Sequence, residues 1–144
     1  MFQRIMLAWD GSDVALAAFD VAIDLTRRYG GELVSVSVAY SPAHAETEAD
    51  RAESSEAAHR HLEATFHDVA DRAHRAGVPV EHQIIEGDTP AKALLGYAHE
   101  HGFDLIICGH HHTRRAGRLL LRDIAEDLYR EARVPVLIVG ENVR

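Results

Sequence analysis

Four arginines and three histidines are concentrated in one segment of an otherwise acidic chain. Residues 105–122 contain no Asp or Glu, although the chain of 144 residues carries a formal net charge of -8. Guanidinium groups form bidentate, charge-assisted hydrogen bonds with carboxylates and phosphates. The segment therefore predicts an anion site, and the alternative is a solvated surface that pairs with nearby acids. Its basic side chains are His110, His111, His112, Arg114, Arg115, Arg118 and Arg122.

The adjacent histidines allow two interpretations. In an extended segment His110 and His112 point the same way, and Asp10 could complete a metal site with them. Histidines in a loop lack the spacing that places ligands on one face of a helix, so we expect no metal. A charge patch that responds to pH is the simpler interpretation, because histidine titrates near neutral pH.

Composition excludes several classes of protein. The net negative charge argues against general binding to nucleic acid. No apolar run is long enough to span a membrane, and the first residues lack the pattern of a signal peptide. Cys108 is the only cysteine, so an internal disulfide is excluded. We expect a single domain over residues 1–144 in the cytoplasm, without a membrane or nucleic-acid partner.

Short β-rich runs alternate with helical stretches along the chain. This alternation predicts an α/β fold in which a mostly parallel sheet of five strands carries four helices on both faces. Ser12 and Thr89 are the expected helix caps, with Pro90 at the first helical position. The expected strands cover residues 5–8, 33–38, 78–85, 105–109 and 134–139, the expected helices cover about 12–29, 52–76, 90–101 and 118–132, and residues 41–50 are expected to form a loop.

The strand order decides which loops can form a site. If the first strand neighbours the fourth, in the order 3-2-1-4-5, the loops after these strands meet at the carboxyl edge, where such sheets bind ligands. Asp10 in the first loop can hydrogen-bond a ribose or an adenine, or it can cap the following helix. We expect Trp9 in the core or in the wall of the site, and Cys108 buried and inert. No arrangement of Ser, His and Asp indicates an enzyme.

The order of these segments resembles the universal stress protein family over essentially the whole chain. Each segment alone is a weak match, but four in the right order are specific. The resemblance implies a Rossmann-like universal stress protein fold and a homodimer that pairs through the last strand, from Val134 to Val139. The matching segments are residues 5–12, which read IMLAWDGS, residues 86–90, EGDTP, residues 104–109, DLIICG, and residues 134–139, VPVLIV.

The phosphate-binding loop of nucleotide-binding relatives is only partly present. Those relatives carry the pattern G-x2-G-x9-G-[ST] after the fourth strand. Only its first glycine is retained here, as Gly109, since the second falls on His112, the third on Arg122 and the Ser or Thr on Asp123. The resemblance places Asp10 and roughly Val38 at the adenine and ribose. The chain thus resembles the branch represented by universal stress protein A, which is not generally regarded as ATP-binding.

Together these features predict a non-catalytic, cytoplasmic universal stress protein that acts in stress response and has lost or altered ATP binding. The alternative is a regulatory sensor that binds ATP, AMP or a cyclic nucleotide through arginine side chains. Slow ATP hydrolysis is a weaker third interpretation, because the Gly-Ser pair is missing. The arginines that would replace the glycine loop are Arg114, Arg115, Arg118 and Arg122.

Overall fold

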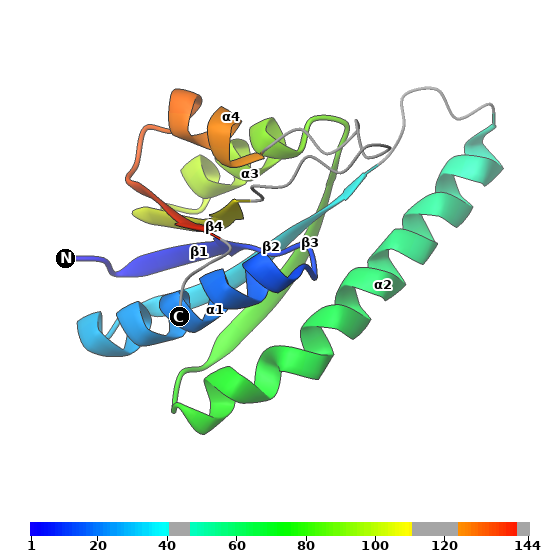
Figure 1. Ribbon diagram of the computed structural model, residues 1–144. Helices are drawn as coiled ribbons and strands as arrows, with labels where there is room; N and C mark the ends of the chain where they lie inside the picture. The colour runs from blue at the N-terminus through cyan, green and yellow to red at the C-terminus, as the bar shows by residue number, and fades with distance from the viewer. Residues whose placement is uncertain (41–46, 111–123, 141–144) are drawn as a thin grey trace.

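A five-stranded parallel sheet occupies the centre of the protein (Figure 1). The computed structural model describes residues 1–40, 47–110 and 124–140. The strand order is β3-β2-β1-β4-β5, and all neighbouring strands are parallel, as the sequence predicts. The strands are β1 (Arg4–Ala8), β2 (Glu32–Tyr40), β3 (Val80–Gly87), β4 (Leu105–His110) and β5 (Val136–Gly140).

Helices cover both faces of the sheet, as expected for parallel strands joined by crossovers. In Figure 1, α1 and α2 lie on one face, while α3 and α4 lie together on the other. No helix among the described residues combines the length and the apolar character that a membrane crossing requires. The helices are α1 (Asp13–Tyr29), α2 (Glu48–Arg75), α3 (Pro90–Glu100) and α4 (Ile124–Glu131).

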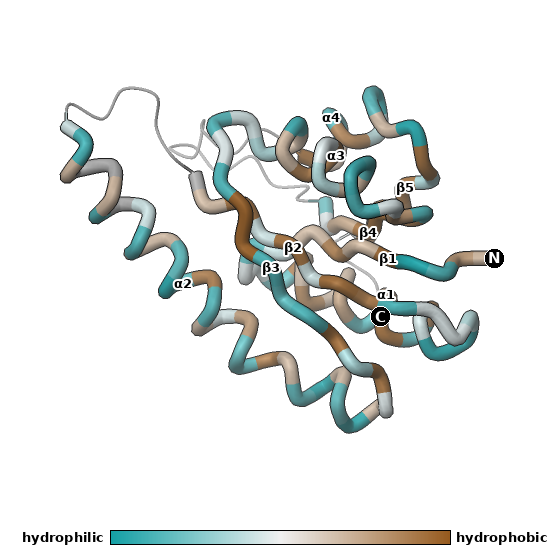
Figure 2. The backbone as a smooth tube through the Cα atoms, turned by 180° about the vertical axis from the view of Figure 1, so that it is seen from behind, coloured by the Kyte–Doolittle hydropathy of each residue, from teal (hydrophilic) through white to brown (hydrophobic). Residues whose placement is uncertain are grey.

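Two hydrophobic clusters fill the spaces between the sheet and its helices. Successive side chains of a strand point to opposite faces, so Ile5 and Leu7 of β1 pack with α1 and α2 while Met6 packs with α3 and α4. All three side chains are fully buried. Figure 2 shows the contrast with α2, whose backbone is largely hydrophilic in colour. Among the described side chains of α2, the first buried one is Leu62.

One of the two predicted helix caps is confirmed, and the other residue occupies the N-cap position without a side-chain hydrogen bond to the helix. The Ser12 hydroxyl accepts a hydrogen bond from the Ala15 amide, which starts α1 as expected. Thr89 makes no side-chain cap, although Pro90 begins α3 as predicted. The Thr89 hydroxyl instead donates to the Asp88 carboxylate at 3.5 Å.

Several element boundaries differ from the sequence prediction. Helix α2 begins at Glu48, inside the segment predicted as a loop, because Glu, Ala, Asp and Arg are acceptable helix residues and an acid is favourable in the first turn. Strands β3 and β5 each begin just after a proline, Pro79 and Pro135, which has no amide to donate to a ladder. Of the predicted helix over 118–132, residues 118–123 lie outside the described part.

Candidate functional site

The carboxyl ends of β1 and β4 lie side by side at the centre of the sheet. The strand order reverses between them, since β2 and β3 follow on one side and β5 on the other. Continuing the observed registers places Asp10 level with Val38 of β2 and with His110 of β4. Loops at such a switch point are the usual ligand site of doubly wound sheets. The fold therefore brings these three predicted residues to one edge.

Asp10 is held in place by the residue that caps α1. Its Oδ1 atom accepts hydrogen bonds from both the amide, at 2.9 Å, and the hydroxyl of Ser12. The Ser12 hydroxyl in turn accepts from Ala15 at 3.2 Å. Asp10 itself is exposed, whereas Ser12 is half-buried. The helix start thus fixes an exposed carboxylate at the carboxyl edge, and Asp10 supports the cap without being the cap.

Trp9 is a core residue directly before Asp10. Its side chain is 4% exposed and lies edge-on to Phe19 and Phe66, with ring centroids 6.0 and 5.9 Å away. The indole Nε1 donates to the Thr65 hydroxyl of α2 at 3.1 Å. A buried indole usually finds such a partner. The prediction of a core or wall position is confirmed, and α2 proves to be part of the surroundings of the loop.

Gly109 is required by packing, whatever its relation to a ligand. A Cβ atom at this position would lie 2.7 Å from the carbonyl oxygen of Val14 and 2.8 Å from its carbonyl carbon. These are backbone atoms in the first turn of α1, and they cannot rotate away. The single glycine retained from the nucleotide-loop pattern therefore has a structural explanation in the contact between β4 and α1.

The remaining predicted residues divide into two groups. Val38 is half-buried and packs on the cluster beside α3, so it offers an apolar surface next to Asp10. Within the described ranges, no cluster of three or more His, Cys, Asp or Glu side chains is arranged to hold a metal ion. The proposed metal set of Asp10, His110 and His112 depends on His112, which those ranges do not include. Six predicted site residues lie outside the described part: His112, Arg114, Arg115, Arg118, Arg122 and Asp123.

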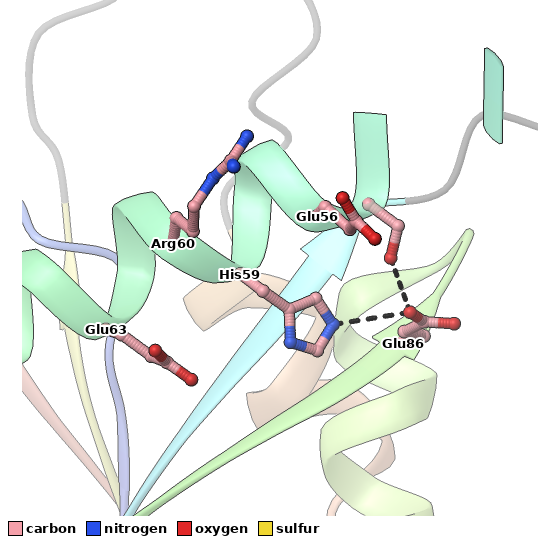
Figure 3. Close-up of a pocket in the computed structure, with 6 residues that line it drawn as sticks. Glu56, His59, Arg60, Glu63 and Glu86 are labelled. Carbon is pink, nitrogen blue, oxygen red and sulfur yellow. Dashed lines mark hydrogen bonds and ion pairs between the residues drawn. The ribbon is translucent and has the colours of Figure 1, made fainter. Parts of the chain in front are cut away.

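A second polar group joins α2 to the edge strand β3 and was missed by the sequence reasoning. Figure 3 shows His59 of α2 beside Glu86, with Nε2 3.3 Å from Oε1, and the Ser55 hydroxyl donates to the same oxygen. Ser55, followed by His59, holds the pKa of Glu86 below its ordinary value. Glu86 stands in the segment EGDTP, but nothing in that segment indicates a partner 27 residues away. We interpret the group as an anchor for α2.

His82 of β3 belongs to the same interface and lies closer to Trp9. Its ring stacks on Phe66, with centroids 4.3 Å apart, and its Nε2 lies 2.9 Å from the Ser37 hydroxyl. Burial lowers the pKa of His82 from 6.5 to about 4, against the opposing influence of Glu63. The imidazole is therefore neutral at neutral pH. Sequence periodicity marks His82 only as an ordinary strand residue.

An α/β protein with a switch point between β1 and β4 and an acidic loop at that point belongs to the broad class of doubly wound sheets. Comparison of the chain with known protein families and solved structures narrows this class. Residues 1–140 match the universal stress protein family, and the chain belongs to that family. A universal stress protein of Thermus aquaticus is 34% identical over 139 residues, which cover 96% of this chain and 99% of the relative.

Solved structures share the fold over nearly the whole chain. Universal stress protein UspA from Lactobacillus plantarum superposes with a TM-score of 0.82 at 22% identity, covering 96% of this chain and 97% of the other. A universal stress protein in complex with cAMP gives 0.71 at 24% identity, with coverage of 96% and 97%. One from Archaeoglobus fulgidus in complex with dAMP gives 0.65 at 18% identity, with coverage of 96% and 98%.

Proposed function

We propose that this protein is a non-catalytic stress-response protein that binds an adenine mononucleotide, such as AMP or cAMP, at the carboxyl edge of its sheet. The observation that carries the proposal is the exposed Asp10 carboxylate, fixed by Ser12 beside the half-buried Val38. A carboxylate at this point suits ribose hydroxyl groups, and an apolar wall suits a base. The structural relatives with bound cAMP and dAMP support this ligand class.

The proposal also includes altered ATP binding. Gly109 is explained by its contact with Val14, so it is no evidence for a triphosphate loop. The other two glycine positions of the pattern carry His112 and Arg122. Side chains at these positions would prevent a triphosphate from approaching the backbone amides as closely as glycine permits. We therefore expect AMP or cAMP to bind more tightly than ATP.

Absence of catalysis is the third component of the proposal. The Ser12 hydroxyl donates to Asp10 and accepts from the Ala15 amide, so it serves as a helix cap. This use of its proton and lone pair argues against a role as an activated nucleophile, which needs an adjacent base aligned for proton transfer. We expect ATP to remain intact when incubated with the protein.

The nucleotide proposal can be tested by calorimetric titration of AMP, cAMP and ATP into the wild-type protein and two variants. Asp10→Ala should weaken AMP binding by about tenfold or more, equivalent to about 1.4 kcal/mol. Asp13→Ala is the matched control, because Asp13 is also exposed and lies one residue beyond Ser12. Equal affinity in wild type and Asp10→Ala would contradict the assigned site, and no binding of any nucleotide at millimolar concentration would overturn the function.

We also infer a homodimer that pairs through β5. This strand ends the sheet, and Ile138 on it is 44% exposed. An unpaired strand edge with an exposed apolar side chain is suited to association with a second copy. Light scattering should give twice the chain mass of 15.9 kDa for the wild type and about the single mass for Ile138→Lys. A wild-type monomer at micromolar concentration would exclude this assembly.

A further inference from the structure

The loop that carries Asp10 is attached to the rest of the protein by two hydrogen bonds of Trp9, one made by its indole and one by its backbone carbonyl. We refer to residues 9–12 as the Asp10 loop. The indole Nε1 of Trp9 donates to Thr65 of α2 at 3.1 Å. The carbonyl oxygen of Trp9 accepts from the Ser37 hydroxyl of β2 at 2.7 Å. Asp10 is the next residue along the chain, so these two bonds fix the point from which its backbone leaves the core.

The Ser37 bond extends to His82 and back to α2. Because the Ser37 hydroxyl gives its proton to Trp9, it must accept from His82, which assigns the ring proton to Nε2. The same ring also stacks on Phe66, at an interplanar angle of 25°. Thr65 and Phe66 are neighbours on α2. One turn of this helix therefore contacts Trp9 directly through Thr65 and indirectly through His82 and Ser37.

A third contact joins the same turn of α2 to the Asp10 loop. Gly11 has a φ of 82°, and a Cβ atom there would lie 3.0 Å from the Thr65 methyl group. The loop therefore passes directly against Thr65. The Thr65 hydroxyl also donates to the Leu62 carbonyl at 2.9 Å, which fixes its rotamer and directs a lone pair toward the indole. The position of α2 thus determines where Gly11 can lie.

From these contacts we propose that α2 positions Asp10 for nucleotide binding, with Thr65 and His82 as the positioning residues. This inference rests on the proposed function and adds a control element to it. A change in the seating of α2 would move Trp9 and Gly11, the residues on either side of Asp10. Closer to its amino end, α2 also contacts strand β3, where Ser55 and His59 bond to Glu86. The affinity of the carboxyl edge for nucleotide therefore depends on how α2 lies against β3.

Thr65→Val tests the direct contact without changing the shape of the side chain. The variant keeps the methyl group near Gly11 and loses the acceptor for the Trp9 indole. We expect AMP affinity to fall by about tenfold at a temperature where the variant is fully folded. Thr65→Ser keeps the hydroxyl and loses only the methyl group near Gly11, so its affinity should fall less than that of Thr65→Val. A purely structural role would lower the melting temperature of Thr65→Val and leave the affinity of the folded protein unchanged.

Strand β2 supplies a matched pair for the indirect contact. Ser35 and Ser37 are both fully buried on the same face, but Ser37 joins His82 to Trp9, while the Ser35 hydroxyl has no hydrogen-bond partner among the described residues. Ser37→Ala should weaken AMP binding, and Ser35→Ala should not. In the ligand-free proteins, hydrogen exchange of the Gly11 and Ser12 amides should speed up in Ser37→Ala and Thr65→Val alone.

The outcomes separate this inference from the proposed function. If the wild type binds AMP and both Ser37→Ala and Thr65→Val bind it equally well, positioning by α2 is wrong and the nucleotide function stands. If the wild type binds no nucleotide, the proposed function fails. Exchange at Gly11 and Ser12 then still decides whether α2 holds the Asp10 loop, and unchanged exchange in both variants would overturn that as well.

Discussion

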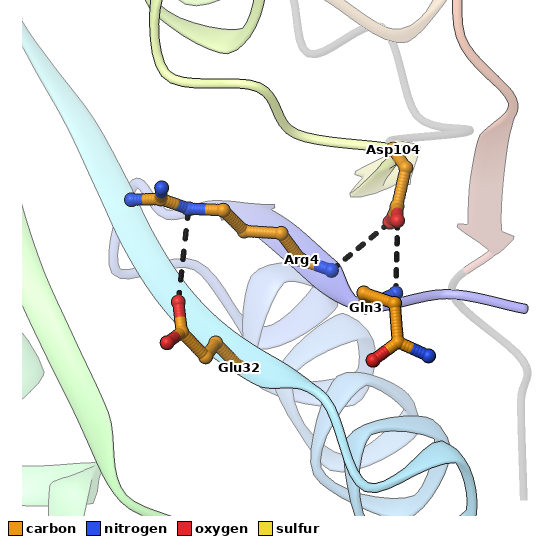
Figure 4. Close-up of polar contacts among 4 residues, drawn as sticks. All are labelled: Gln3, Arg4, Glu32 and Asp104. Atoms are coloured by element: carbon orange, nitrogen blue, oxygen red, sulfur yellow. Dashed lines mark hydrogen bonds and ion pairs between the residues drawn. The ribbon is translucent and has the colours of Figure 1, made fainter.

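The two ends of β1 are each organised by an aspartate, but in different ways. At the amino end, Asp104 accepts hydrogen bonds from the amides of Gln3 and Arg4, at 2.8 and 3.1 Å (Figure 4). These partners are about a hundred positions away in the sequence. At the carboxyl end, Asp10 accepts from Ser12, two positions away, and remains exposed.

The difference separates a carboxylate that holds the fold together from one that lies at the proposed nucleotide site. Asp104 joins the start of β4 to the start of β1, and the backbone continues this junction, because the Asp104 amide donates to the Arg4 carbonyl. Loss of Asp104 would remove the side-chain acceptor of two backbone amides, those of Gln3 just before β1 and of Arg4 at its first position. Loss of Asp10 would disturb one tight turn. Aspartates at the ends of strands therefore need to be assigned by the sequence distance of their partners as well as by their residue type.

Gly109→Ala should have the largest effect and would sharpen the comparison by showing that the carboxyl end also has a structural component. The added methyl group would meet the Val14 backbone at 2.7 Å, so we expect a loss of about 3 kcal/mol in the free energy of unfolding. Urea denaturation measures this change. Gly96→Ala in α3 is the control, because its Cβ would meet no described residue within 4 Å, and we expect a gain of about 0.5–1 kcal/mol. A stable Gly109→Ala variant would remove the packing explanation of this glycine.

Asp104→Ala should have the next largest effect and tests the comparison directly. Two hydrogen bonds from backbone amides to a carboxylate are lost, and we expect a cost of about 2–3 kcal/mol in unfolding free energy. Asp10→Ala should cost less than about 1 kcal/mol, because its bonds lie within one exposed turn. Nucleotide affinity should show the opposite order. Equal stability losses in the two variants would break the distinction between the two ends.

The pH dependence of stability should reveal the titration of His82, which is joined through Ser37 to Trp9 at the carboxyl end of β1. Its pKa is about 4 in the folded protein against an ordinary 6.5, so the unfolded chain binds this proton more readily. Its contribution is complete above pH 6.5 and is lost as the pH falls from 6.5 toward 4. After allowance for partial solvent access, we expect a loss of about 1–2 kcal/mol over this window.

His82→Gln provides the control for that titration. Glutamine retains a donor for the Ser37 hydroxyl and does not ionise. The unfolding free energy of the variant, measured from pH 7 to pH 4, should fall less steeply than that of the wild type. Parallel pH profiles for the two proteins would show that His82 is not responsible.

Glu32→Gln should have the smallest effect and tests whether exposed charges matter at the amino end. Its carboxylate lies 3.8 Å from Arg4 Nε, and the Glu32 side chain is 74% exposed. The Arg4 guanidinium also lies over the Phe103 ring, 4.8 Å from its centroid. We therefore expect Glu32→Gln to change the unfolding free energy by less than about 0.5 kcal/mol. A larger loss by urea denaturation would mean that this pair contributes to the junction made by Asp104.

Local sequence patterns predict most of the fold but only part of the candidate site. Apolar runs and the Ser12 cap give the elements, and their alternation gives parallel strands with Asp10 after β1. The strand order came from a common arrangement and from the family resemblance, because periodicity cannot distinguish it. The start of α2 at Glu48 could not be predicted, because the described side chains before Leu62 are not buried and the first turns therefore show no hydrophobic period.

The contacts around Trp9 could not be predicted because each partner comes from a different element. Thr65, Ser37 and His82 lie on α2, β2 and β3, and nothing in their local sequence marks them as polar neighbours of an indole. Gly109 was interpreted from a ligand-binding pattern, whereas the fold shows that its space is occupied by α1. Such contacts appear only when the strands have been placed side by side.

The buried thiol of Cys108 can report how often this fold opens. Cys108 is the only cysteine, it is 2% exposed, and it lies within the interior strand β4, one residue before Gly109. An added thiol reagent can modify it only after the sheet opens, so the labelling rate reports how often the native structure is lost. A nucleotide that binds the closed state would slow that rate in proportion to its occupancy. Every variant can therefore be compared by the rate at which one sulfur atom becomes accessible.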